Sequence, residues 1–148
     1  MTYLASSCFK VTKIKDLLEF CQKSGFYQIE LSGNLEFNQK TTNELTEAKN
    51  FSWLIHNYWP IPDKPFVLNL ASTNKSIREK SLDHCQRALR LCQTLGAPFY
   101  SVHAGFLADL DPNDLGAKQT NRPRIDQATG LKNFTDSVSQ LLRETRVD

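Results

Sequence analysis

Two histidines carry the first chemistry that this sequence suggests. His56 closes one short apolar run and His103 closes another, and loop residues follow each of them. In a chain of alternating strands and helices such a residue lies at the carboxyl end of its strand, where parallel α/β folds place their sites. Neighbouring strands lie about 5 Å apart. We therefore expect both imidazoles to reach one metal ion or one substrate oxygen.

Four other residues are candidates for substrate contacts near His56. Side chains alternate along a strand, which places Glu30 on the same side as His56. Because a carboxylate inside a fold is costly unless it is paired or solvated, Glu30 is either a pocket residue or evidence that the register is off by one. Tyr58 and Trp59 follow His56 and either stack on a sugar ring or fill the core. Asn69 either contacts the pocket or caps the following turn.

The elements that must position these residues alternate between strands and helices. Apolar spacing, glycines and prolines predict strands over residues 3–9, 27–31, 51–58 and 99–104. They predict helices over residues 13–23, 75–95 and 131–143, with a short peripheral one within 39–50. Such an order predicts a parallel sheet with right-handed crossovers. We expect one domain over residues 1–148, with His84 on a helix surface. The side of the last helix that we expect to be buried carries Leu131, Phe134, Val138, Leu141 and Leu142.

The two faces of the predicted strands differ, which favours a barrel over a doubly wound sheet. One side carries polar residues toward the carboxyl ends, and the other is apolar and suited to helices; the polar side holds Gln28, Glu30, Ser32, His56, Ser101 and His103. A sheet with helices on both faces should show near-continuous hydrophobic strands instead. In a barrel, the inner face at the carboxyl ends is the floor of the active site.

Composition narrows the class of protein. The chain has 148 residues, 40% of them hydrophobic, and a net charge of +2. That balance is too even to indicate nucleic-acid binding from charge alone. There is no apolar run long enough for a membrane span. The four cysteines form no CxxC pair, so we expect buried thiols in a reducing compartment, the cytoplasm.

Several segments together resemble the xylose isomerase-like TIM barrel superfamily, which includes sugar-phosphate isomerases and epimerases and endonuclease IV-type repair enzymes. These segments are IELSG at 29–33, HNYWP at 56–60, FVLNLAS at 66–72, IREKS at 77–81 and LGAPFYSVHAGF at 95–106. The resemblance implies a (βα)₈ barrel of which the chain supplies the first four units. In endonuclease-type members the histidines that match His56 and His103 are metal ligands. In epimerase-type members these positions more often line the substrate pocket.

The resemblance also implies that most metal and catalytic residues lie on later strands. A full barrel takes about 250 residues, so the chain is expected to be a truncated or half barrel, inactive alone. Its unpaired edges predict a homodimer or a complementary second-half chain. The expected function of the intact form is a sugar or sugar-phosphate isomerase or epimerase dependent on zinc, manganese or magnesium. The alternatives are a zinc-dependent DNA-repair phosphodiesterase and a non-catalytic, self-associating half barrel.

Overall fold

The computed structural model describes residues 2–116 and 122–144. The chain divides into two compact units, which we describe separately. The first comprises Met1–Asp63 and Arg87–Val102, and the second comprises Lys64–Gln86 and His103–Asp148. One long helix, α3 (Lys75–Leu95), contributes its first half to the second unit and its last turns to the first. The prediction of a single domain over 1–148 stays a prediction.

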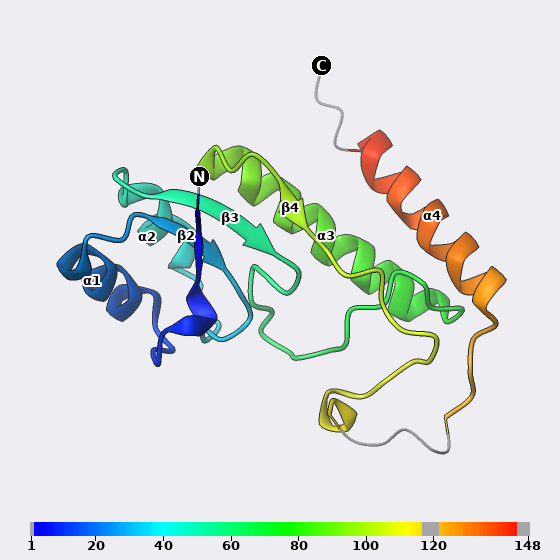
Figure 1. The fold of residues 1–148 in the computed structure, drawn as a ribbon. Helices are drawn as coiled ribbons and strands as arrows, with labels where there is room; N and C mark the ends of the chain where they lie inside the picture. Colours follow the sequence, from blue (N-terminus) through cyan, green and yellow to red (C-terminus); the bar gives the residue numbers. More distant parts are fainter. Residues whose placement is uncertain (1, 117–121, 145–148) are drawn as a thin grey trace. The chain divides into compact units, whose positions relative to one another are not determined.

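The first unit contains a parallel sheet in the order β1-β2-β3-β4 (Figure 1). Its strands are β1 (Leu4–Ala5), β2 (Gln28–Leu31), β3 (Ser52–His56) and β4 (Tyr100–Ser101). Helices α1 (Ile14–Ser24) and α2 (Thr41–Glu47) follow β1 and β2, and α3 follows β3. Strands that are consecutive in sequence are therefore neighbours in the sheet. This order confirms four parallel βα units, the arrangement of half a TIM barrel.

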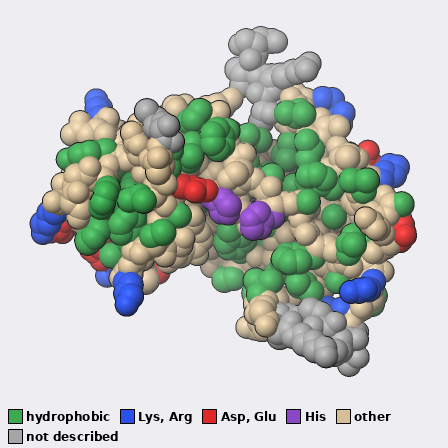
Figure 2. All heavy atoms as spheres, in the orientation of Figure 1, with side chains coloured by type: hydrophobic (Ala, Val, Ile, Leu, Met, Phe, Trp, Pro, Cys, Tyr) green, Lys and Arg blue, Asp and Glu red, His purple; other side chains and the backbone are tan. Residues whose placement is uncertain are grey.

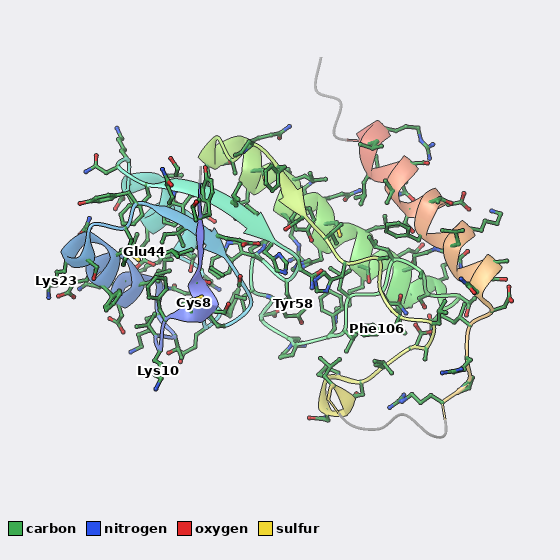
Figure 3. The ribbon with its side chains drawn as sticks, viewed as in Figure 1. Cys8, Lys10, Lys23, Glu44, Tyr58 and Phe106 are labelled. Atoms are coloured by element: carbon green, nitrogen blue, oxygen red, sulfur yellow. The ribbon has the colours of Figure 1, made fainter. Side chains whose placement is uncertain are left out.

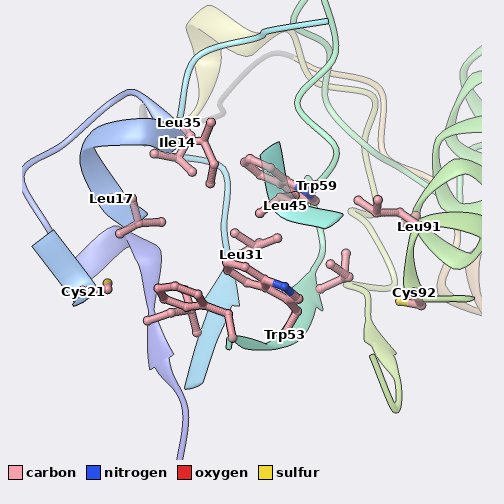
Figure 4. Close-up of a cluster of buried hydrophobic side chains, with 14 residues drawn as sticks. Ile14, Leu17, Cys21, Leu31, Leu35, Leu45, Trp53, Trp59, Leu91 and Cys92 are labelled. Carbon is pink, nitrogen blue, oxygen red and sulfur yellow. The ribbon is translucent and has the colours of Figure 1, made fainter. Parts of the chain in front are cut away.

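One face of this sheet is buried under helices, as the alternation predicts. Inward side chains from α1, α2 and the last turns of α3 pack on the apolar face of β2 and β3 (Figure 4). The packed residues are Ile14, Leu17, Cys21, Ile29, Leu31, Leu45, Trp53, Ile55, Ala88, Leu91 and Cys92. Gly25 ends α1 with φ 74°, a left-handed conformation that costs glycine little. The opposite face of β2 and β3 keeps Glu30 and His56 only half buried.

The outer strands are shorter than predicted, for reasons of hydrogen bonding. β4 holds two residues because its partner β3 ends at His56, which pairs with Ser101. The next residue, Asn57, has φ 35° and leaves the extended conformation, so nothing remains to pair with Val102 and beyond. β1 gives way to a 3₁₀ turn at Ser6–Cys8, where the Ser6 hydroxyl accepts a hydrogen bond from the Ser32 N–H at 2.9 Å.

The second unit contains the start of α3, a 3₁₀ turn η2 (Pro112–Asp114) and the helix α4 (Gln127–Glu144). The bounds predicted for α3 are confirmed, and Asn74 caps it: its side-chain oxygen accepts from the Ser76 N–H at 3.0 Å. α4 begins four residues before the predicted start because an Asp126 carboxylate oxygen accepts from the Thr129 N–H at 3.0 Å.

Three burial predictions were wrong. Leu131 and Leu142 are each 61% exposed, whereas Leu141 is buried as predicted, together with Gly130 and Ser137 of the same helix. His84 is fully buried, with its ring edge-on to Phe66 at 5.7 Å between centroids. Cys8 is exposed, unlike the other three cysteines (Figure 3). Successive residues of a helix point about 100° apart, so Leu131 and Leu142 each lie off the face that buries their neighbours Gly130 and Leu141.

Candidate functional site

His56 is the last residue of β3, which lies between β2 and β4 in the sheet. Its backbone is held on both sides of the turn that follows. The Asn57 N–H donates to the Ser101 carbonyl at 2.6 Å, and the Trp59 N–H donates to the His56 carbonyl at 3.1 Å. The Tyr100 hydroxyl donates to the Asn57 carbonyl at 2.6 Å. The left-handed Asn57 therefore ends the strand at a fixed place and sets the position of the imidazole.

The imidazole of His56 contacts a carboxylate and a hydroxyl from the two neighbouring strands. Its Nδ1 lies 2.8 Å from Glu30 Oε1 and 3.0 Å from Ser101 Oγ. The His56 and Glu30 side chains are 34% and 28% exposed, so both reach solvent. An ionised carboxylate only accepts hydrogen bonds, so a neutral His56 ring bonds to Glu30 when Nδ1 is the donor. The second ring nitrogen, Nε2, then carries the lone pair.

The predicted placement of Glu30 on the same side as His56 is confirmed by this contact. The register pairs Glu30 with Leu54 and His56 with Ser101, and the buried Ile29 faces the opposite side. Ser101 was not among the predicted site residues. The same counting in twos along the strand placed it on the polar side, so the signal was present in the alternation.

The two aromatic residues after β3 lie in different environments. Trp59 is 1% exposed and belongs to the buried cluster of the first unit, which matches the interpretation that it fills the core (Figure 4). Tyr58 is half buried in the loop after β3 (Figure 3) and packs over Gly33, where an added Cβ would lie 3.4 Å from the tyrosine Cβ. Substrate contacts by either residue stay predictions.

His103 and Asn69 belong to the second unit. Asn69 is 1% exposed and its side-chain amide joins two segments of that unit. Its Nδ2 donates to Asp109 Oδ1 at 2.9 Å and to the Ala108 carbonyl at 3.3 Å. Its Oδ1 accepts from the N–H groups of Ala71 at 3.2 Å and Phe106 at 3.1 Å. The bond from Ala71 matches the predicted turn cap, and a substrate contact by Asn69 stays a prediction.

His103 is exposed and lies two residues before Gly105, which has φ 113°. A Cβ at Gly105 would lie 2.1 Å from Asn69 Oδ1, so the buried amide fixes the segment that carries His103. The prediction that His103 and His56 converge on one ion stays a prediction, because the two residues lie in units that are described separately.

The described residues do not form a metal site by themselves. Among residues 2–116 and 122–144 there is no group of three His, Cys, Asp or Glu side chains placed to hold an ion. A zinc site takes at least three protein ligands. His56 fits one such ligand position, because metal-bound imidazoles characteristically donate their other ring N–H to a carboxylate. The described residues therefore offer only some of the ligands that a zinc site needs.

A pocket of about 420 Å³ lies elsewhere in the first unit. It is lined by the segments Glu36–Gln39, Thr41–Thr42 and Trp59–Asp63 together with Arg87 and Leu91. Of the predicted site residues it includes Trp59 alone.

The helices of the described residues were compared with the length and hydrophobicity of a membrane span, and none reaches both.

Most of the sequence matches a known protein family. The family model described as xylose isomerase-like TIM barrel matches residues 14–147. A probable endonuclease 4 of Aquifex aeolicus is 44% identical over 80 residues, 54% of this chain and 23% of that protein. A probable endonuclease 4 of Persephonella marina is 28% identical over 87 residues, 59% of this chain and 25% of that protein. The aligned segments therefore span about a quarter of these relatives.

Solved structures show the same fold. A D-tagatose 3-epimerase-like protein matches with TM-score 0.63 and 18% identity, over 92% of this chain and 47% of that one. The 3-keto-D-glucoside 4-epimerase from E. coli matches with TM-score 0.61 and 16% identity, over 97% and 52%. Endonuclease IV from Thermus thermophilus matches with TM-score 0.53 and 12% identity, over 99% and 46%. The chain belongs to the xylose isomerase-like TIM barrel family and spans about half the length of these barrels.

Proposed function

We propose that this chain supplies the first four βα units of a divalent-metal-dependent isomerase or epimerase acting on a small sugar or sugar phosphate. The observation that carries the proposal is the half-exposed His56 imidazole at the carboxyl end of β3, bonded through Nδ1 to Glu30. In barrel enzymes the groups that bind the substrate lie at this end of the strands. The match to the xylose isomerase-like TIM barrel family supports a substrate site at this end of the strands.

His56 and His103 are the proposed ligands that this chain offers to a zinc, manganese or magnesium ion. When bound, such an ion polarises a substrate carbonyl or hydroxyl. Two imidazoles do not complete a site, so the remaining ligands and the bases for an enediol-type proton transfer would come from further strands. We infer that a second copy of this chain or a complementary second-half chain provides them, and that the chain alone is inactive. Its free cysteines fit a reducing compartment, the cytoplasm.

A second candidate is an endonuclease IV-like phosphodiesterase. The observation that favours it is the 44% identity with the Aquifex aeolicus protein over 80 residues. Binding to the phosphates of DNA calls for clustered Lys and Arg. On the face drawn in Figure 2 the described Lys and Arg side chains are scattered and form no single patch. The sequence also has no dense stretch of Lys and Arg, which favours the smaller substrate.

Parallel assays separate the two functions. The purified chain is incubated with Zn²⁺, Mn²⁺ or Mg²⁺ and either a panel of ketoses and ketose phosphates or a duplex that contains one abasic site. Isomerised or epimerised sugar supports the first candidate, whereas strand cleavage at the abasic site supports the second. If the chain alone is inactive, the assays are repeated with a chain that carries the remaining strands of a family member.

Variants of the proposed ligands test the metal. His56→Ala and His103→Ala should each lower Zn²⁺ affinity in isothermal titration by at least about tenfold, since each removes a ligand. His84→Gln is the control, because His84 is buried in α3 and is not a proposed ligand. Unchanged affinity in both ligand variants would contradict the proposed site.

A further inference from the structure

We propose that Glu30 and Ser101 are positioning residues that hold the His56 imidazole in its Nδ1–H tautomer, so that Nε2 is the nitrogen presented to a metal ion or a substrate oxygen. The inference deepens the proposed function and rests on it for the role of Nε2. It assigns Glu30 to the ring of His56 rather than to the substrate. It also adds Ser101, which the sequence pattern had left unassigned.

The contact with Glu30 determines which ring nitrogen of His56 carries the proton. A neutral imidazole has one N–H, and either ring nitrogen can carry it. Glu30 Oε1 lies 2.8 Å from Nδ1, and an ionised carboxylate offers no proton, so the pair forms only when Nδ1 is the donor. Placing the proton on Nε2 would set two lone pairs against each other at this distance. The carboxylate therefore selects the tautomer.

The Ser101 hydroxyl contacts the same ring nitrogen from the neighbouring strand β4. Ser101 Oγ lies 3.0 Å from Nδ1 and 3.5 Å from the carbonyl oxygen of Ile55. When Nδ1 carries the ring proton, the Ser101 oxygen accepts from it with a lone pair, and the hydroxyl proton can turn toward the Ile55 carbonyl. Both neighbours of Nδ1 then accept from the same N–H. Two acceptors contributed by two different strands restrict rotation of the ring as well as its tautomer.

The contact between His56 and Glu30 matters more for the orientation of the ring than for folding stability. His56 and Glu30 are 34% and 28% exposed, and an ion pair that solvent reaches contributes little to folding stability. Orientation of the ring is therefore the larger consequence of the contact. Metal-ligating imidazoles have the same second contact, and its loss typically weakens metal binding about 10–100-fold.

The tautomer can be read directly by nuclear magnetic resonance, without metal or substrate. Long-range ¹H–¹⁵N correlation spectra of the ¹⁵N-histidine-labelled chain are recorded at about pH 8, above the usual imidazole pKa of about 6.5. The chain has three histidines, and the His56 signals are assigned from their absence in His56→Gln. We expect a protonated Nδ1 and an unprotonated Nε2 in the wild-type chain.

Variants then separate positioning from a merely structural role. Glu30→Ala should shift His56 toward the Nε2–H form, whereas Glu30→Gln, which keeps an oxygen acceptor of the same reach, should retain the Nδ1–H form. Gln28→Ala, on the same strand and the same face, is the matched control and should leave the tautomer unchanged. If Glu30→Ala fails to fold, the tautomer of His56 is measured in Glu30→Gln, where the Nδ1–H form is expected. An Nε2–H tautomer in the wild-type chain, or a tautomer indifferent to Glu30→Ala, would overturn the proposal.

Zn²⁺ titration gives the second readout. Glu30→Ala and Ser101→Ala should weaken Zn²⁺ binding about 10–100-fold, with Gln28→Ala unchanged. The two readouts distinguish the two proposals. A correct tautomer with no Zn²⁺ binding contradicts the proposed metal-dependent function and leaves the positioning of His56 supported, whereas Zn²⁺ binding with the wrong tautomer contradicts the positioning alone.

Discussion

The buried side-chain amide of Asn69 is fully hydrogen-bonded within the second unit. All four of its hydrogen-bonding positions are used, two by N–H groups of the backbone and two by the oxygens of Ala108 and Asp109. The close approach of Gly105 leaves no space for a side chain at that position. The segment after His103 is therefore held by a polar contact that depends on a glycine.

Gly105→Ala should destabilise the chain strongly. The added methyl group would lie 2.1 Å from Asn69 Oδ1 and 2.9 Å from its Cα, and the backbone at φ 113° is unfavourable for alanine. We expect a loss of roughly 2–4 kcal/mol in the free energy of unfolding, since strain and broken buried hydrogen bonds add. Urea denaturation measures it. Gly116→Ala is the control, because φ is 86° there but no atom of the described residues lies within 4 Å of an added Cβ. An equal loss in both variants would show that backbone strain alone accounts for the effect.

We expect the Cys92 thiol to make the free energy of unfolding fall as pH rises above about 9. Burial raises the pKa of its thiol from 9.0 to about 11. A raised pKa means that the folded chain holds the proton more tightly than the unfolded chain, so this contribution is complete below about pH 9 and is lost as pH rises toward 11. Urea midpoints of the wild-type chain and Cys92→Ala, measured between pH 8 and 11, should differ by an amount that changes over this window. A constant difference would contradict the expectation.

At the scale of elements, α3 depends on its first turn. Asn74 Oδ1 accepts from the N–H groups of Ser76 at 3.0 Å and Ile77 at 3.4 Å, which satisfies two groups that the helix itself cannot. Asn74→Ala should therefore cost about 1 kcal/mol of unfolding free energy, measured by urea denaturation. Thr73→Ala changes an exposed residue one position earlier and should cost much less; a similar cost would mean that the cap contributes little.

The elements also show which features the sequence could predict. Helix α3 was placed correctly because a cap, a long apolar face and a terminal glycine all agree. The alternation along β2 and β3 placed Glu30 beside His56 because that pattern depends only on the strand itself. The length of β4 could not be predicted, since it depends on where its partner β3 turns away at Asn57. The hydroxyl of Ser101 lay on the predicted side, but its role depends on a contact with another strand.

At the scale of the whole molecule, the sheet of the first unit has two outer strands. β1 pairs only with β2 and β4 only with β3, so each has one side without a strand partner among the described residues. Exposed strand edges are templates for pairing with another chain. About half of each solved barrel that this chain resembles lies outside the matched part. Both facts support the proposed second copy or complementary chain.

The mass of the chain in solution tests self-association. Light scattering over a range of concentrations should give twice the mass of one chain, because pairing at an edge satisfies the backbone groups of both copies. Phe99, which precedes β4, is 56% exposed, and Phe99→Lys should weaken the dimer by placing a charge beside that edge. Leu142→Lys is the control, because Leu142 is 61% exposed on α4 and far from the edge strands in sequence. A monomer at every concentration would contradict the homodimer and leave the complementary chain as the proposed partner. A dimer that withstands Phe99→Lys would assign the contact to β1 or to another surface.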